Sequence, residues 1–133
     1  MGMYTEVLVK ADIKAISAQN KAALRFLFGD GDTALLDVLG LPDHPFFKSE
    51  RWNSIGRSSS YYHIPKALNF FDGSYLFSRS DMKSYNGEAE LFFDWLIKHC
   101  ADVEHGECVG YIWYETWDKP KLVCGGDDLL GSE

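Results

Sequence analysis

Cysteine is scarce in this chain of 133 residues, and its three positions, Cys100, Cys108 and Cys124, are odd in number and irregularly spaced. Such a set is a poor disulfide framework, because small secreted domains pair their cysteines in even numbers. No apolar run approaches the roughly 18 residues of a membrane span. The first ten residues also lack the basic-then-apolar pattern of a secretory signal. These absences favour a reducing compartment, and we expect a cytoplasmic protein.

Basic residues are also fewer than acidic ones. Lys and Arg number 13 against 20 Asp and Glu, which gives a net charge of −7 at pH 7. Nonspecific contact with nucleic acid or with an anionic membrane depends on basic side chains. The composition therefore argues against both partners and permits a basic protein partner. Stacking of bases on Tyr61 and Trp113 would need a local basic stripe, for which the middle third offers Lys48, Arg51, Arg57, Lys66 and Arg79.

Apolar residues, by contrast, are abundant, at 46% of the chain with 15% aromatic. A chain of this length and composition can bury a core without metals or disulfides. We expect one domain over residues 1–124, followed by a flexible acidic tail over residues 125–133. No cofactor is expected.

The apolar pattern alternates between strand and helix periods. Tyr4–Ile13 has period two and predicts a half-buried strand, whereas Gly87–His99 carries Ala89, Phe92 and Leu96 on one helical face. Leu41–Asn53 is a long aromatic segment, of a kind that is often functional or packed by its own rings. The other predicted elements are helices at Ala18–Phe28 and Ala34–Leu39 and strands at Ser54–Ile64, Leu68–Phe71, Ser74–Ser80, Val109–Thr116 and Lys121–Cys124.

Asp72-Gly73 separates two of these strands and is a strong hairpin signal. One bulged strand with a glycine kink is an open alternative for Leu68–Ser80. With the hairpin, the order of elements predicts an α+β fold. We expect a two-layer sandwich in which two main helices cover one face of an antiparallel sheet, ferredoxin-like β-α-β-β-α-β with an added C-terminal hairpin strand.

Such a sandwich leaves one sheet face uncovered, and aromatic residues on that face would contact a partner rather than fill the core. Tyr61, His63, Tyr111 and Trp113 are the candidates on the predicted strands, and Trp52 is the candidate in the long segment. A one-residue shift of register would exchange the two faces. These five residues form the predicted partner-binding set.

The densest group of metal-ligand types is His99, Cys100, His105 and Cys108. Structural zinc needs about four such groups converging tetrahedrally, and this spacing matches no zinc finger. A histidine at a helix end and buried thiols account for the same residues. We therefore predict no metal site, although metal binding at these four residues stays open. The run Gly56–Ser60 matches neither a nucleophile elbow nor a P-loop.

Two histidines lie beside polar neighbours, in Asp43-His44 and Tyr62-His63. A general base needs a substrate pocket and an orienting group, and the sequence shows neither. The principal hypothesis is a non-enzymatic protein–protein interaction module, with a homodimer as one possible assembly. The alternative is a small-molecule binder or enzyme with an aromatic pocket near His44, Trp52 and His63.

Several segments resemble a group of small uncharacterised phage and prophage proteins. They are Met3–Glu6, Leu41–Phe47, Ser59–Tyr62 and the stretch from Ser84-Tyr85-Asn86 to Phe93-Asp94-Trp95-Leu96. The resemblance covers most of the chain and brings no activity that could be assigned to particular residues. It implies a bacterial cytoplasm and a role in the conflict between phage and host, such as modulation of a host protein.

Overall fold

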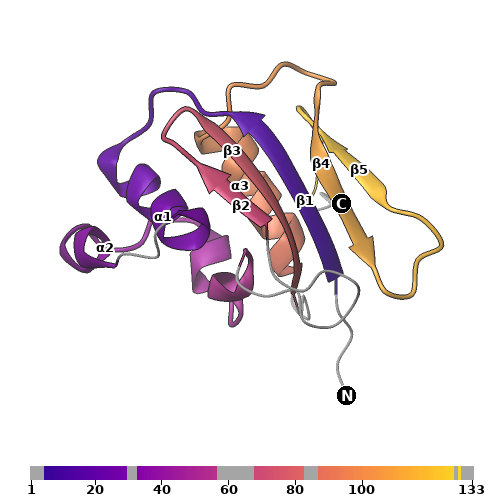
Figure 1. The fold of residues 1–133 in the computed structure, drawn as a ribbon, viewed down its shortest axis with the longest axis horizontal. Helices are drawn as coiled ribbons and strands as arrows, with labels where there is room; N and C mark the ends of the chain where they lie inside the picture. The colour runs from indigo at the N-terminus through magenta and orange to yellow at the C-terminus, as the bar shows by residue number, and fades with distance from the viewer. Residues whose placement is uncertain (1–4, 30–32, 57–67, 83–86, 128, 130–133) are drawn as a thin grey trace.

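The computed structural model describes residues 5–29, 33–56, 68–82, 87–127 and 129. Within these ranges one five-stranded sheet has the order β2-β3-β1-β4-β5, with every neighbouring pair antiparallel (Figure 1). The strands are β1 Thr5–Asp12, β2 Leu68–Phe71, β3 Tyr75–Met82, β4 Cys108–Tyr114 and β5 Lys121–Cys124. The helices are α1 Ala18–Phe28, α2 Ala34–Leu39 and α3 Glu88–His99, with short 3-10 turns η1 Pro45–Lys48 and η2 Trp52–Ser54.

Strand β1 lies at the centre of the sheet and shows the predicted alternation. Thr5, Val7, Val9 and Ala11 are buried, while the residues between them are half-buried or exposed. Val7 pairs with Ser80 of β3 and with Ile112 of β4, and both partners are also buried. Because directly opposite residues share a face, this register puts one continuous core-facing surface on β3, β1 and β4.

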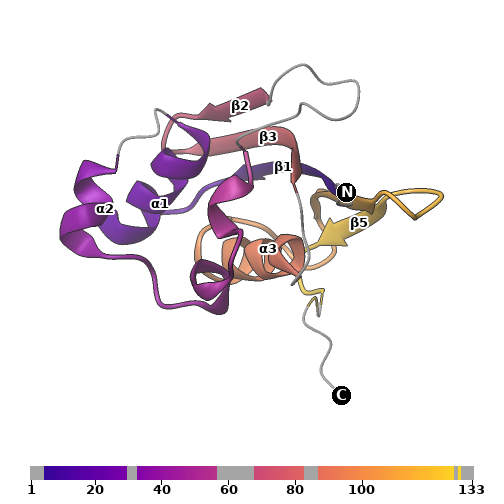
Figure 2. The same ribbon diagram turned by 90° about the horizontal axis from the view of Figure 1, so that it is seen from below.

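The helices supply the second layer. Figure 2 shows α1, α2 and α3 on the same side of the sheet. Helix α1 begins where the Oγ of Ser17 accepts a hydrogen bond from the backbone N–H of Asn20 (3.1 Å). Helix α3 buries Phe92, Trp95 and Leu96. The predicted α+β fold, with helices covering one face of an antiparallel sheet, is confirmed.

The path between α1 and β2 is longer than a simple βαβ unit requires. Residues 29–67 carry α2 and both 3-10 turns within the described part of this stretch. The ferredoxin-like assignment itself therefore stays a prediction.

The aromatic segment before β2 packs by its own rings, one of the two outcomes expected for it. The ring centroid of Phe46 lies 5.4 Å from that of Phe92, and the ring of Phe47 lies 4.9 Å from that of Trp95. Trp52 contacts Phe47 at 5.3 Å. Such tilted ring pairs add to the burial of the rings, so this segment closes the helical layer as part of the core.

One predicted strand, Ser54–Ile64, is wrong at its start. Ser54 ends the 3-10 turn η2, and Ile55 and Gly56 form a turn. Gly56 has a φ of +75°, and its N–H donates to the Oγ of Ser80 (3.0 Å). A positive φ suits glycine in a turn rather than in a strand. The remainder of the predicted strand lies outside the described residues.

The turn at Asp72-Gly73 connects two strands as a hairpin, so Leu68–Ser80 is not one bulged strand. The backbone N–H groups of Ser74 and Tyr75 both donate to Oδ1 of Asp72 at 2.9 Å. These hydrogen bonds lower the pKa of Asp72, because they stabilise its charged form. Strand β3 then returns beside β2, with Phe70 opposite Phe77.

The start of the predicted tail is attached to the domain. The N–H of Gly125 donates to the carbonyl of Glu107 (2.9 Å), and Leu129 packs against the core. The division into residues 1–124 and a flexible tail over 125–133 stays a prediction, since most of the later residues are outside the described ranges. No helix of the described ranges combines the length and the apolar character of a membrane span.

Candidate functional site

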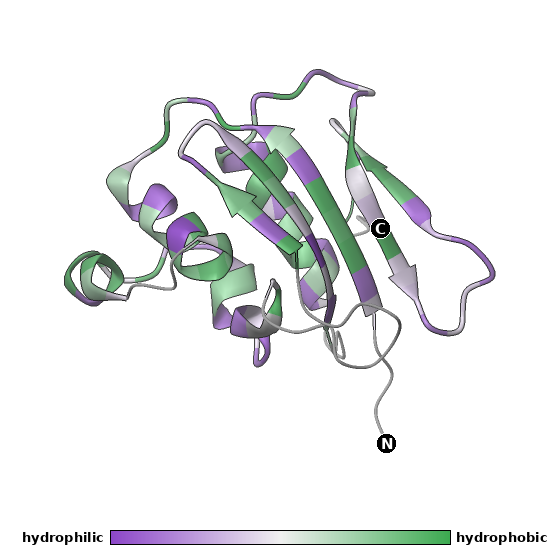
Figure 3. Cartoon of the chain, in the orientation of Figure 1, coloured by the Kyte–Doolittle hydropathy of each residue, from purple (hydrophilic) through white to green (hydrophobic). Residues whose placement is uncertain are grey.

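The sheet face opposite the helices is rich in apolar and aromatic side chains. We call it the open face, and Figure 3 shows that β2 and β5 at its two edges are largely hydrophobic. Four of its large side chains are well exposed: Leu68 (48%), Phe70 (51%), Tyr75 (37%) and Leu122 (59%). By the strand register, the described residues of the open face are Glu6, Leu8, Lys10, Asp12, Leu68, Phe70, Tyr75, Phe77, Arg79, Asp81, Cys108, Tyr111, Trp113, Leu122 and Cys124. Asp81 alone among them is buried.

The register sets one row of these side chains across all five strands. Leu8 of β1 is opposite Arg79 of β3 on one side and Tyr111 of β4 on the other. Leu68 extends the row on β2, and Leu122 extends it on β5. Directly opposite side chains in a sheet lie about 5 Å apart, so the row is a continuous apolar strip that only Arg79 interrupts.

A polar cluster lies in the middle of the open face. Oε2 of Glu6 accepts hydrogen bonds from Nε of Arg79 (3.1 Å) and from the hydroxyl of Tyr111. Burial raises the pKa of Tyr111 to about 12, and the hydrogen bond and charge of Glu6 act in the same direction. The cluster holds the Tyr111 ring in place across β4, β1 and β3, and it pairs the carboxylate of Glu6 with the guanidinium of Arg79.

The shifted tyrosine predicts a loss of stability in alkali. A phenol whose pKa is raised on folding contributes stability below its ordinary value near 10, and this contribution disappears as the pH rises toward 12. We expect Tyr111→Phe to flatten the fall in unfolding free energy between pH 10 and 12, as measured by urea denaturation across that range. Trp113→Phe, on the same strand, should leave the fall unchanged. An unchanged slope in Tyr111→Phe would contradict the assignment.

The five residues of the predicted partner-binding set do not lie together: two are on the open face, one is on the helical side, and two lie outside the described residues. Tyr111 and Trp113 lie on the open face, with ring centroids 6.4 Å apart. Trp52 is on the helical side, half-buried against Phe26 and Phe47. Tyr61 and His63 lie outside the described residues.

The sequence analysis missed the exposed side chains of β2 and β5. Both strands have only four residues, and apolar side chains lie at neighbouring positions in each, so alternation alone does not separate their exposed residues. This limit applies to Leu122 in particular. Its place on the open face follows from its pairing with Tyr111.

His44 is buried, and its two ring nitrogens link the backbone of Phe46 to the side chain of Asp94. Its Nδ1 accepts from the N–H of Phe46 (3.0 Å), so Nε2 carries the proton and donates to Oδ2 of Asp94 (2.9 Å). Oδ1 of Asp94 also contacts Nζ of Lys98 at 2.9 Å. Both ring nitrogens are therefore occupied, and His44 fixes the turn η1 to helix α3 rather than presenting a free base to a substrate.

The predicted metal-ligand types do not converge. Across the described ranges, which include His99, Cys100, His105 and Cys108, no group of three or more such side chains could hold a metal ion. Cys100 is buried, and burial raises its pKa to about 12. Cys108 instead lies opposite Cys124 in the β4–β5 ladder.

The candidate basic stripe is divided between surfaces. Arg79 is bonded to Glu6 on the open face, whereas Lys48 follows the η1 aromatics on the helical side and pairs with Asp43 at 3.3 Å. Arg57 and Lys66 lie outside the described residues. The described members therefore do not form one basic surface.

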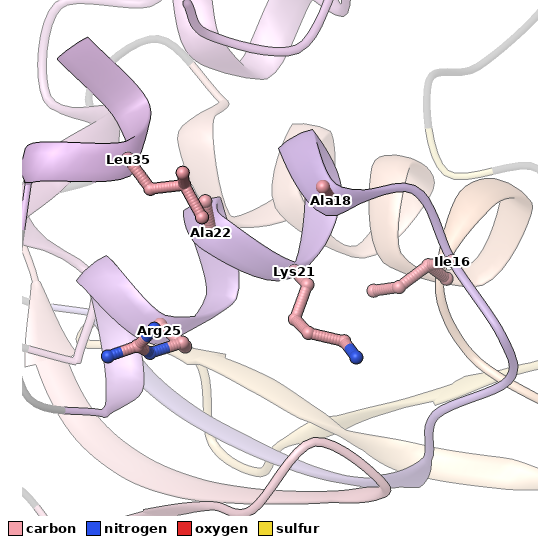
Figure 4. A pocket seen from close by; sticks show the side chains of 6 residues that line it. All are labelled: Ile16, Ala18, Lys21, Ala22, Arg25 and Leu35. Carbon is pink, nitrogen blue, oxygen red and sulfur yellow. The ribbon is translucent and has the colours of Figure 1, made fainter. Parts of the chain in front are cut away.

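In the part of the chain that the structure describes, two hollows lie along α1. One, of about 270 Å³, is lined by the six residues that Figure 4 shows, among them Ile16, Lys21 and Leu35. The other, of about 590 Å³, shares Lys21 and Arg25 with the first and extends to Phe71. Neither is lined by His44 or Trp52, so neither corresponds to the predicted aromatic pocket.

Comparisons of the chain with family models, with curated proteins and with solved structures each give no match.

Proposed function

We propose that this chain is a non-enzymatic interaction module that binds another protein through its open face. The observation that carries the proposal is the exposure of Leu68, Phe70 and Leu122 on a sheet surface that the described helices leave uncovered. Large apolar patches on soluble domains commonly mark sites of protein contact. Tyr111 and Trp113 add the aromatic character typical of interface centres.

The charge of the chain narrows the class of partner. The net charge of −7 favours approach to a basic surface. On the open face, the Glu6–Arg79 pair leaves an apolar strip whose complement is an apolar patch with a basic rim. The resemblance to phage and prophage proteins supports a host protein as the partner and the bacterial cytoplasm as the compartment.

The alternative function, a pocket near His44, Trp52 and His63, stays a prediction that the described geometry does not favour. Both nitrogens of His44 are bonded, and Trp52 packs against Phe47. His63 is outside the described residues.

The proposal predicts that polar substitutions on the open face weaken partner binding. The double variant Phe70→Ser/Leu122→Ser removes two exposed anchors without creating a buried polar group, because both side chains are more than half exposed. A partner recovered from bacterial lysate with the unaltered chain should lose at least about tenfold in affinity, since interface anchors each contribute roughly 1–2 kcal/mol. Calorimetric titration with the purified partner measures the loss.

The matched control is Val38→Ser/Leu41→Ser, which alters two exposed apolar residues at and just after α2, away from the sheet. Its affinity should equal that of the unaltered chain. Equal losses in both double variants, or no loss in either, would contradict binding through the open face. Self-association of the chain, lost only in the open-face variant, would identify the partner as a second copy.

A further inference from the structure

Strands β4 and β5 place two cysteines directly opposite each other. Cys108 and Cys124 are ladder partners at the end of this antiparallel pair. Opposite residues of such a pair have Cα atoms about 4.5–5.5 Å apart, which lies within the range of about 4.4–6.8 Å that a disulfide spans. Neither cysteine forms a disulfide in this structure.

The backbone hydrogen bonds around Cys108 and Cys124 show whether they form a hydrogen-bonded or a non-hydrogen-bonded pair of the antiparallel ladder. The N–H of Gly125 donates to the carbonyl of Glu107 at 2.9 Å, one step beyond the cysteines. The N–H of Cys124 donates to Oδ2 of Asp127 at 2.8 Å, and not to Cys108. Cys108 and Cys124 therefore form a non-hydrogen-bonded pair, the position at which opposite side chains are closest.

The two thiols differ in accessibility. Cys108 is exposed, whereas Cys124 is half-buried. Partial burial, the adjacent Cys108 thiol and the Asp127 carboxylate raise the pKa of Cys124. An external disulfide therefore reaches Cys108 first. Cys124 is then placed to attack the mixed disulfide that forms at Cys108. The third cysteine, Cys100, is buried in the core.

We propose that Cys108 and Cys124 are an oxidative modification site that closes to an intramolecular disulfide by exchange with a small disulfide of the glutathione class. The Cys108 thiolate attacks one sulfur of oxidised glutathione, forming a mixed disulfide and releasing one glutathione thiolate. The Cys124 thiolate then attacks Sγ of Cys108, forming the Cys108–Cys124 bond and releasing the second glutathione thiolate. Each protein thiol loses one proton to solvent, and the glutathione disulfide receives both electrons.

The disulfide would hold the edge strand β5 to β4 through a closed loop that contains the turn at Trp117. Because Leu122 of β5 extends the apolar strip, the modification also fixes one border of the open face. The inference does not depend on the proposed function, since it rests on the pairing of the two cysteines alone.

The test incubates the purified chain with oxidised glutathione and reads intact mass and free thiols. We expect the unaltered chain to lose two hydrogens without a glutathione adduct, and to regain them with dithiothreitol. Cys124→Ser should retain one glutathione on Cys108, because the second step is then missing. Cys108→Ser should be modified more slowly than Cys124→Ser, because the thiol of Cys124 is less accessible than that of Cys108. Cys100→Ser should behave as the unaltered chain.

Thermal unfolding supplies a second readout. The oxidised form should melt about 5 °C or more above the reduced form, because the crosslink restricts the unfolded chain, and this gain should be absent from both serine variants. Equal melting of the reduced variants and the reduced parent verifies that each variant folds. A stable glutathione adduct on the unaltered chain, a disulfide-linked dimer, or no reaction would each overturn the proposal.

Discussion

Replacing Gly110 with alanine should lower the free energy of unfolding by more than about 4 kcal/mol, or prevent folding altogether. A Cβ at this position would lie 1.8 Å from the carbonyl oxygen of Leu8 and 3.1 Å from Cα of Val9. Both atoms belong to the backbone of the central strand β1, so neither can move away as the end of a flexible side chain could. Gly110 also has a φ of +152°, which side-chain-bearing residues rarely adopt.

The matched control is Gly73→Ala in the β2–β3 hairpin. Gly73 has a φ of +97°, but no heavy atom would lie within 4 Å of an added Cβ. This variant therefore isolates the backbone cost, about 1–2 kcal/mol. Urea denaturation followed by circular dichroism measures both variants. Similar values for Gly110→Ala and Gly73→Ala would show that β4 can move away from β1 at little cost.

Gly110 also shows where sequence analysis reaches its limit. The register of β4 against β5 shifts between Cys108 and Gly110, so the ladder is irregular next to the position where a Cβ would collide with β1. The alternation over Val109–Thr116 was sufficient to predict the strand and the shared face of Tyr111 and Trp113. It gave no sign of the irregularity, because the close approach depends on residues of β1 about a hundred positions earlier in the chain.

Local patterns predicted the elements that have one clear period. Thr5–Asp12 is a strand because every second residue enters the core, and Glu88–His99 is a helix because its apolar residues recur every three or four positions. The strand predicted to begin at Ser54 is wrong over Ser54–Gly56, because serine and glycine fit either a strand or a turn. The positive φ of Gly56 and its hydrogen bond to Ser80 decided for the turn.

The candidate site was predictable only in part for the same reason. Tyr111 and Trp113 were identified from alternation in one strand, whereas their neighbours Leu8 and Leu122 reach the same strip through pairing between strands. Spacing along the chain likewise gave no reason to pair Cys108 with Cys124. Contacts of this kind follow from register, which a single sequence specifies poorly.

Replacing His44 with alanine should destabilise the fold by about 2–4 kcal/mol. The change leaves the N–H of Phe46 without its acceptor and removes a donor from the buried carboxylate of Asp94. Lys98 still contacts Oδ1 of Asp94, which limits the loss. The sequence offered Asp43 as the neighbour of His44, but the actual partner is 50 positions away on α3.

Asp43→Ala is the matched control for this change. Asp43 pairs with Lys48 at 3.3 Å, but its side chain is 96% exposed, and surface ion pairs contribute little. We expect a change below about 0.5 kcal/mol there. Paired urea curves at pH 7 compare the two variants. A histidine kept for catalysis at the expense of stability would give the opposite result, because His44→Ala would then be neutral or stabilising. A large loss confined to His44→Ala would identify the His44–Asp94 pair as the attachment of the aromatic segment to α3.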